Sequence, residues 1–281
     1  MAEPPDMANE TDDSYLSPPV QRAARLLRHI AEGDPVVNMA RTARELGINR
    51  TTLLRLLHTL EAERLIERRG GDTPGWRIGF GLIGMAAQAF FSEDLVQVAV
   101  PVLTRLADAL GLSAHLGVLD GREVVYLIRR MPNHAFASNI RVGSRLPAHA
   151  ANMGRIILAH LPAAKVDALY ANAPMPAATA HTAVTLPQLH DKLAQDRAAG
   201  LAWSDGHYED RISSVAAVVL DAAGQPVAAV NVSGLSASFA GEKRRAQIGQ
   251  AVTQAGLEIS HQLGWHGRTR ADGVVGLKVV A

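Results

Sequence analysis

Residues 39–60, MARTARELGINRTTLLRLLHTL, contain two short amphipathic segments with a turn between them. The first segment predicts a helix over residues 39–46, and Gly47 ends it. Asn49 offers an N-cap for a second helix that extends to about Glu63. Leucines at helical spacing predict the buried face of this second helix: Leu53, Leu56, Leu57 and Leu60. Two helices joined by a short turn that contains glycine form the helix-turn-helix pattern.

The flanking residues complete a winged module. Apolar residues at helical spacing after two prolines predict a further helix over residues 20–32. On the other side, residues 65–69 and 76–78 resemble short strands, and the glycine-rich polar turn between them predicts a β-hairpin. A basic hairpin in this position is typical of the wing of a winged helix. Residues 18–80 are therefore predicted to form a winged helix-turn-helix domain.

Charge is distributed unevenly along the 281 residues, although the formal net charge is only +1. Residues 1–17 hold five acidic residues and no basic one, and they predict a disordered acidic tail. Residues 18–80 hold eleven arginines and seven acidic residues, a local net charge of +4. The near-neutral total therefore hides a basic region, which favours a nucleic-acid partner.

Polar and basic side chains lie off the leucine face of the second helix, mostly in its first turn. DNA-reading helices present this end to bases and phosphates in the major groove. We therefore expect a DNA-binding surface on the helix-turn-helix and the wing, made of Arg41, Asn49, Arg50, Thr51, Thr52, Arg55, Arg68, Arg69 and Arg77. The alternative is a three-helix module whose arginine face is merely solvated.

Residues 79–84, GFGLIG, match the G-x-G-x-x-G pattern of dinucleotide-binding proteins. That fold needs a βαβ unit with an acidic residue at the end of its second strand. Residues 82–110 have a helical pattern instead, broken near Pro101, so Asp108 falls within a helix. We therefore predict a linker helix over residues 81–95. A dinucleotide-binding redox sensor remains an alternative.

The remaining residues predict an α+β effector domain over 96–266, followed by a tail over 267–281. Turn sequences at Asp120-Gly121 and at residues 222–225 separate apolar strands, which predicts two β-hairpins. Hairpins with grouped helices indicate an antiparallel sheet with helices packed on it, not a doubly wound fold. The predicted helices cover residues 98–110, with Pro101 in the first turn, 148–161, 163–170, 186–199 and 241–263.

The sequence contains no recognisable catalytic constellation. It has no cysteine and no G-x-S-x-G, H-E-x-x-H or P-loop motif. Its eleven histidines are scattered without ligand spacing. We therefore expect no enzymatic activity, no metal and no other cofactor. No apolar run is long enough to span a membrane, and the acidic N-terminus is unlike a signal peptide, so we expect a cytoplasmic protein.

Small polar residues interrupt otherwise apolar strands at Ser214, Asn231 and Ser233. Asn231 and Ser233 are two positions apart in a strand, so both point to the same face of the sheet. Small hydrogen-bonding groups in an apolar wall can orient a polar ligand in a pocket. Such residues can equally bond the backbone at an edge or a turn, and the sequence leaves both interpretations open.

Several segments, taken together, resemble the IclR family of bacterial transcriptional regulators over residues 18–265. In the N-terminal part the resemblance rests on residues 43–48 (ARELGI), residues 51–60 (TTLLRLLHTL), Ile78-Gly79 and Ile83-Gly84. In the C-terminal part it rests on residues 143–155 (GSRLPAHAANMGR), 214–217 (SVAA) and 230–234 (VNVSG).

This resemblance implies a winged helix-turn-helix, a linker helix that dimerises, and a GAF-like effector domain that binds small carboxylic or aromatic acids. Such proteins are usually dimers or dimers of dimers on palindromic operators in double-stranded DNA. Matching positions imply effector contacts from the loop over residues 150–154 and from the polar strand positions, at Ala150, Ala151, Met153, Gly154, Asp205, Ser214, Asn231 and Ser233. Arg211 departs from the pattern, because family members often have glycine there.

The leading hypothesis is therefore a transcriptional regulator whose operator binding responds to a small organic acid. Two alternatives remain. One is an enzyme whose N-terminal module only dimerises, and the other is the dinucleotide-binding redox sensor.

Overall fold

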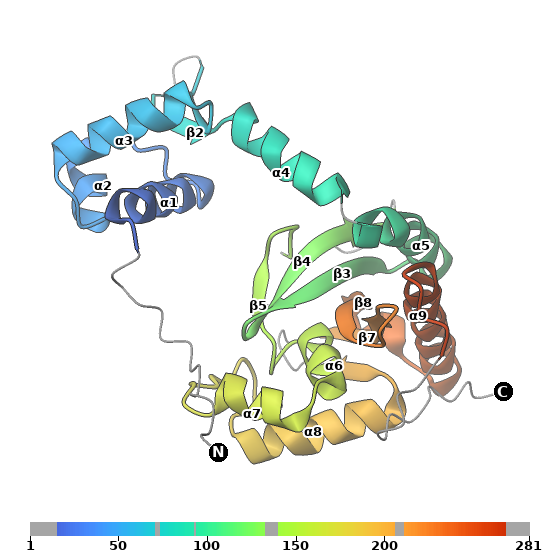
Figure 1. Ribbon diagram of the computed structural model, residues 1–281. Helices are drawn as coiled ribbons and strands as arrows, with labels where there is room; N and C mark the ends of the chain where they lie inside the picture. The colour runs from blue at the N-terminus through green and yellow to red at the C-terminus, as the bar shows by residue number, and fades with distance from the viewer. Residues whose placement is uncertain (1–15, 71–73, 93, 133–139, 206–210, 268–281) are drawn as a thin grey trace, which may run out of the picture. The chain divides into compact units, whose positions relative to one another are not determined.

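The computed structural model describes residues 16–70, 74–92, 94–132, 140–205 and 211–267 (Figure 1). The chain divides into two compact units, residues 1–91 and residues 92–281. The predicted acidic tail, apart from Leu16 and Ser17, lies outside the described residues, as does the predicted C-terminal tail beyond Gly267.

Within the N-terminal unit, three helices and a two-stranded antiparallel hairpin pack together ahead of helix α4, Phe80–Ser92. All three helices and both strands contribute to its core, including Leu26, Ala43, Leu53, Ile66 and Trp76. The predicted winged helix-turn-helix is therefore confirmed. Its elements are α1 Pro18–Ala31, α2 Met39–Glu45, α3 Arg50–Ala62, β1 Ile66–Arg68 and β2 Trp76–Ile78.

Close packing at the exit from the wing explains two glycines of residues 79–84. A Cβ on Gly79 would lie 2.4 Å from the carbonyl oxygen of Arg64, and a Cβ on Gly81 would lie 2.5 Å from the same oxygen. Helix α4 begins directly after Gly79 and contains Gly81 in its first turn. The strand before this motif, β2, pairs with β1 in an antiparallel hairpin. In the described residues, the motif is therefore not part of the parallel βαβ unit that a dinucleotide-binding fold needs.

The C-terminal unit contains a six-stranded antiparallel sheet in the order β5-β4-β3-β8-β7-β6. Its four central strands form the two predicted hairpins, β3 with β4 and β7 with β8. The hairpins are joined by the pairing of β3 with β8, in which Ser113 lies opposite Ser233. The strands are β3 Ser113–Asp120, β4 Glu123–Arg130, β5 Arg145–Pro147, β6 Ala202–Asp205, β7 Ile212–Leu220 and β8 Pro226–Leu235.

Helices cover both faces of this sheet (Figure 1). On one face, α9 approaches β7 so closely that a Cβ on Gly256 would lie 2.8 Å from the carbonyl oxygen of Val218. On the other face lies α6, with α7 and α8 beside it. The helices are α5 Asp94–Leu110, α6 Asn152–His160, α7 Ala163–Tyr170, α8 Leu186–Ala199 and α9 Glu242–Gln262, with a short 3₁₀ helix, η2 Ser236–Phe239, before α9.

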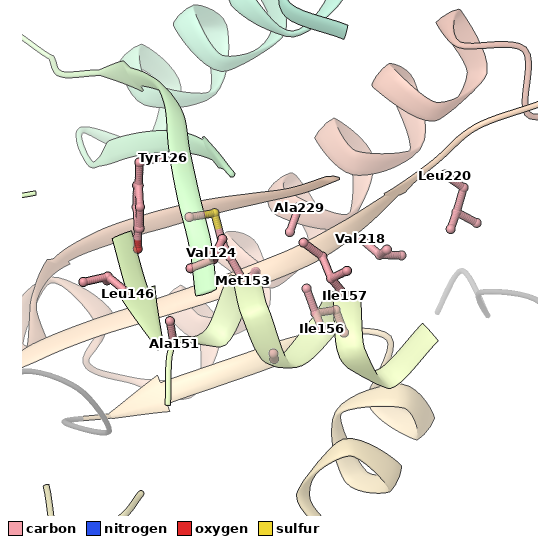
Figure 2. Packing of buried hydrophobic residues seen from close by; sticks show 12 residues of the cluster. Val124, Tyr126, Leu146, Ala151, Met153, Ile156, Ile157, Val218, Leu220 and Ala229 are labelled. Atoms are coloured by element: carbon pink, nitrogen blue, oxygen red, sulfur yellow. The ribbon is translucent and has the colours of Figure 1, made fainter. Parts of the chain in front are cut away.

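The core under α6 is formed by side chains that point from this helix toward the strands (Figure 2). Met153, Ile156 and Ile157 belong to it, together with Val124 and Val218 of the sheet. These side chains are at most 3% exposed, so α6 is held firmly on the sheet. Its first turn therefore provides a fixed platform for any site at this end.

Two predicted helices begin at other residues than expected. Helix α5 begins at Asp94, which places Pro101 in the helix interior rather than in the first turn. Pro101 is exposed, so its ring lies on the solvent side of the helix rather than in the core. Helix α6 begins at Asn152, because residues 148–151 form a turn packed against it. A Cβ on Gly154 would lie 2.3 Å from the Cα of Ala148.

Candidate DNA-binding surface and ligand cavity

The first turn of α3 is fixed by its N-cap. The side-chain oxygen of Asn49 accepts a hydrogen bond from the backbone N–H of Thr52 at 2.7 Å. The leucines on the other side of α3 are buried, whereas Arg50, Thr51 and Arg55 are exposed. The predicted reading face therefore exists as a solvent-accessible surface, and Asn49 serves first as a helix cap.

Several of the predicted DNA-binding arginines are already paired with acidic groups. Arg41 bonds Asp34, Arg77 lies 3.1 Å from Glu67, and Arg68 lies 3.5 Å from Glu61. The guanidinium of Arg68 also stacks 4.1 Å from the ring centroid of Trp76.

Arg50 and Arg55, in contrast, form no ion pair with any described residue. The charges of these two arginines of α3 are therefore more readily available to a phosphate or a base than those of the paired arginines.

A cavity in the C-terminal unit lies between the first turn of α6 and the polar ends of the strands. The space in it that water could occupy is about 40 Å³, room for a few water molecules and below the usual range of small-ligand pockets. Its apolar wall is formed by Tyr126, Ile140, Leu146, Ala151 and Ile212, of which Tyr126, Leu146 and Ala151 are labelled in Figure 2. Its polar wall is formed by Asn152, Ser204, Ser214, Asn231 and Ser233.

The strand register brings the three predicted polar positions together. Ser214 of β7 lies opposite Ser233 of β8, and Ala216 lies opposite Asn231. Side chains two residues apart on β8 therefore share one face with Ser214, and all three line the cavity. Ala151 lines it from the α6 side.

The other residues expected to contact an effector lie elsewhere. Met153 and Gly154 belong to α6, so residues 152–154 are helical and the expected loop ends at Ala151. The Met153 side chain is buried in the core. Ala150 borders a different cavity of about 510 Å³, together with His149 and Lys192.

Asp205 faces away from the cavity toward α9. Its carboxylate pairs with Arg245 at 3.2 Å and accepts a hydrogen bond from Ser213 at 2.9 Å. Next to it, Arg211 has φ +66°, a left-handed conformation that glycine adopts far more easily. This backbone geometry suits the glycine that the family resemblance implies at the position.

A chain of buried polar side chains, which the sequence did not indicate, lies behind the cavity wall. The amide nitrogen of Asn152 lies 3.0 Å from the Ser214 hydroxyl and 3.3 Å from the carbonyl oxygen of Ala202. The Asn231 amide donates to the Asn152 side-chain oxygen at 3.2 Å. His115 Nδ1 lies 2.9 Å from the Asn231 side-chain oxygen. Burial lowers the pKa of His115 to about 4, so its ring is neutral at pH 7.

The other buried histidines have structural partners. His149 Nε2 lies 3.1 Å from the carbonyl oxygen of Pro176, and His160 Nδ1 lies 2.8 Å from that of Ile156. Burial lowers the pKa of both imidazoles. Among the described residues, His29, Asp34 and Glu45 are the one group with metal-ligand spacing, and Arg41 already neutralises Asp34 there. No described helix combines the length and apolar character that a membrane span needs.

Comparison with known proteins matches both parts of the chain to one family. Residues 19–70 match the IclR helix-turn-helix domain, and residues 87–261 match the C-terminal domain of the bacterial transcriptional regulator IclR. The chain is 30% identical over 246 residues to the HTH-type transcriptional regulator XynR of Escherichia coli, covering 88% of this chain and 97% of that protein. It is 27% identical to the transcriptional repressor IclR of E. coli, covering 85% of this chain and 87% of that protein.

Solved structures share the fold. An IclR transcriptional regulator from Alicyclobacillus acidocaldarius has a TM-score of 0.77 at 24% identity, covering 89% of this chain and all of that one. An IclR homologue from Microbacterium hydrocarbonoxydans, crystallised with 4-hydroxybenzoate, has a TM-score of 0.76 at 23% identity, covering 87% and 98%. Domain matches over most of the chain and a relative at 30% identity agree: the chain belongs to the IclR family of bacterial transcriptional regulators.

Proposed function

We propose that this regulator binds operator DNA through α3 and the wing, and that a small organic acid in the cavity beside α6 changes its affinity for DNA. The observation that supports this most directly is that Arg50 and Arg55 on α3 are exposed and form no ion pair with a described residue, while polar side chains converge on one wall of a small cavity in the C-terminal unit. A relative of similar fold was crystallised with 4-hydroxybenzoate, an aromatic acid of the expected class.

The DNA-binding surface comprises the exposed groups of α3 with Arg68, Arg69 and Arg77 of the wing. Arg50 and Arg55 lack acidic neighbours among the described residues, so phosphate or base contact requires no existing ion pair to break. Arg77 must leave Glu67, and Arg41 must leave Asp34, before either can give its full charge to DNA. We therefore expect the α3 arginines to contribute most.

Replacing Arg55 with alanine is expected to weaken binding by about 1–3 kcal/mol, because an unpaired guanidinium contacts DNA. The measurement is a gel shift at fixed salt on duplexes that the wild-type protein selects from a random library. Arg41→Ala is the matched control and should cost less, since its guanidinium is neutralised by Asp34 and Glu45. An unchanged midpoint for Arg55→Ala would remove Arg55 from the surface.

Association of two copies is proposed to occur through α4. This helix is apolar on several sides and leaves Phe80, Ile83 and Met85 exposed in a single chain. Soluble proteins rarely leave a large apolar patch exposed to water, and such patches mark sites where another protein surface binds. Two copies joined along α4 present two α3 helices, which suits a palindromic operator. The effector then acts by favouring one spacing of the two reading helices over another.

The ligand contacts are proposed to come from Ser214, Asn231 and Ser233, with backbone groups of Ala151. Ser214→Ala combined with Ser233→Ala should abolish the rise in melting temperature that a bound acid produces. The assay is a thermal shift with a panel of small carboxylic and aromatic acids that includes 4-hydroxybenzoate. DNA binding without effector should be unchanged in the double variant. A shift that persists in it would place the pocket elsewhere.

We propose that the protein has no catalytic activity and works in the cytoplasm, where operator DNA is found. His115, His149 and His160 of the C-terminal unit bond Asn231, Pro176 and Ile156 rather than a nucleophile. The enzyme alternative predicts weak, salt-independent DNA affinity. A steep fall of affinity with rising salt favours the regulator.

A further inference from the structure

Four buried or half-buried side chains form one continuous hydrogen-bonded chain behind the cavity. They come from four different elements: His115 from β3, Asn231 from β8, Asn152 from α6 and Ser214 from β7. His115, Asn231 and Asn152 are at most 3% exposed. Amide and imidazole groups can each bond in two orientations. One neighbour with a fixed role as acceptor is therefore enough to decide which group donates and which accepts at every hydrogen bond between these four side chains.

That neighbour is the backbone carbonyl of Ala202, which can only accept. It lies 3.3 Å from one end of the Asn152 side-chain amide, so this end must be the NH₂ group. The same nitrogen lies 3.0 Å from Ser214 Oγ. The Ser214 oxygen therefore accepts from Asn152.

The hydrogen of the Ser214 hydroxyl has no acceptor among the described residues. Because Ser214 lines the cavity, this hydrogen is available to whatever the cavity holds.

The hydrogen bonds of Asn231 and His115 follow from the same carbonyl of Ala202, which is the anchor of the hydrogen-bonded side chains. With its nitrogen toward Ala202, Asn152 turns its oxygen to Asn231, whose NH₂ group donates across 3.2 Å. Asn231 then presents its oxygen to His115 Nδ1 at 2.9 Å, so that nitrogen carries the proton. His115 Nε2 has no described partner that would favour the opposite tautomer.

We propose that the Ala202 carbonyl, acting through Asn152, orients this chain so that Ser214 donates its hydrogen into the cavity and selects a ligand group that accepts. The inference rests on the proposed function and makes it more specific. The selected group is a carboxylate or carbonyl oxygen, and a group with donors alone is rejected. Asn152 and His115 are positioning residues, because they act through Ser214 and Asn231.

The tautomer of His115 tests the direction without any ligand. In full-length protein labelled with ¹⁵N-histidine, two-bond ¹H–¹⁵N correlation spectra at pH 7.5 distinguish the Nδ1–H and Nε2–H forms. The protein supplies both references, because His160 must hold its proton on Nδ1 and His149 on Nε2 to donate to backbone carbonyls. His115, assigned with His115→Gln, should match His160. A spectrum that matches His149 would overturn the proposal.

Two variants test the role of the anchor. Asn152→Leu removes the link to Ala202, so Asn231 is free to turn and His115 should become a mixture of tautomers. Ser214→Ala, the control, leaves the anchor intact and should leave His115 unchanged. An unchanged His115 in folded Asn152→Leu would contradict the proposal. If circular dichroism shows that Asn152→Leu does not fold, the proposal is judged by the tautomer of His115 in the wild-type protein alone.

The ligand side is tested with shape-matched pairs, 4-hydroxybenzoate with 4-hydroxybenzamidine and acetate with acetamidine. Wild-type protein should bind each acid more tightly than its amidine, because the amidinium end offers donors only and leaves the Ser214 hydrogen without an acceptor. Ser214→Ala should lose about tenfold to a hundredfold in acid affinity, as expected for a hydrogen bond to a charged group. Equal binding of acid and amidine would overturn the proposal.

Failure of the two proposals can be told apart. If no acid binds but His115 has its proton on Nδ1, the acid-effector function fails and the orientation stands. If an acid binds and His115 has its proton on Nε2, the function stands and the orientation fails.

Discussion

Replacing Asp196 with alanine is expected to lower the free energy of unfolding of the C-terminal unit by about 3–5 kcal/mol. Asp196 of α8 bonds Arg155 of α6 at 2.8 Å, and the two side chains are only 6% and 2% exposed. Arg155 also donates to the carbonyl oxygen of Trp203 in β6 at 2.6 Å. The pair therefore connects two helices and an edge strand. Without Asp196, a guanidinium charge stays buried without its counterion.

Chemical denaturation followed by circular dichroism measures this effect. Glu258→Ala is the matched control, because Glu258 forms a pair of similar length with Arg105, 2.6 Å, in an exposed position. Exposed pairs contribute little, so this variant should lose no more than about 1 kcal/mol. Arg155→Met combined with Asp196→Leu should recover most of the loss, since no charge is left buried. A loss for Asp196→Ala as small as that of the control would contradict the prediction.

Stability is expected to fall by about 3 kcal/mol between pH 6.5 and pH 4 because of His115. Burial is the largest cause of its low pKa of about 4, and the charge of Arg129 on the neighbouring strand adds to it, whereas the hydrogen bond to Asn231 opposes both. The unfolded chain takes up a proton near pH 6.5, and the native protein does so only near pH 4. His115 therefore costs no stability above pH 6.5. The free energy of unfolding decreases as the pH falls from 6.5 to 4, and His115 causes no further decrease below pH 4.

The measurement compares denaturation at a series of pH values for wild-type protein and His115→Gln. Two other histidines with lowered pKa values, His149 and His160, act in the same direction, and Asp196, whose pKa burial raises, acts in the opposite direction. Only the difference between the two proteins isolates His115. Curves that run parallel from pH 6.5 to pH 4 would show that His115 does not control this acid sensitivity.

Much of the fold could be predicted because the signals are local. Gly47 and Asn49 mark the turn between α2 and α3, and Asp120-Gly121 marks the turn between β3 and β4. The edge strands β5 and β6 were not predicted, because they have only three and four residues and too little alternation to be recognised. Their existence depends on pairing with β4 and β7.

The candidate cavity was predicted in part. Ser214, Asn231 and Ser233 could be found because each is a polar residue in an apolar strand. Asn152 carried no such signal, because it lies at the start of a helix whose first turn was placed four residues too early. His115 lies in a strand, but its partner Asn231 is 116 residues away in the sequence. Bonds of this kind depend on sheet order, which residue patterns do not specify.

The pairing of β3 with β8 has a consequence for the order in which the protein is made. Contacts between residues far apart in a chain form slowly, and during synthesis they cannot form before the later partner has left the ribosome. The contacts of α3 and the wing, including the hydrogen bond from Trp76 N–H to the carbonyl oxygen of Pro35, lie within residues 18–80, so this part can fold while the rest of the chain is still being translated. The wall that holds His115 against Asn231 is completed last. A newborn chain would thus have its helix-turn-helix before the cavity that we propose to hold a ligand.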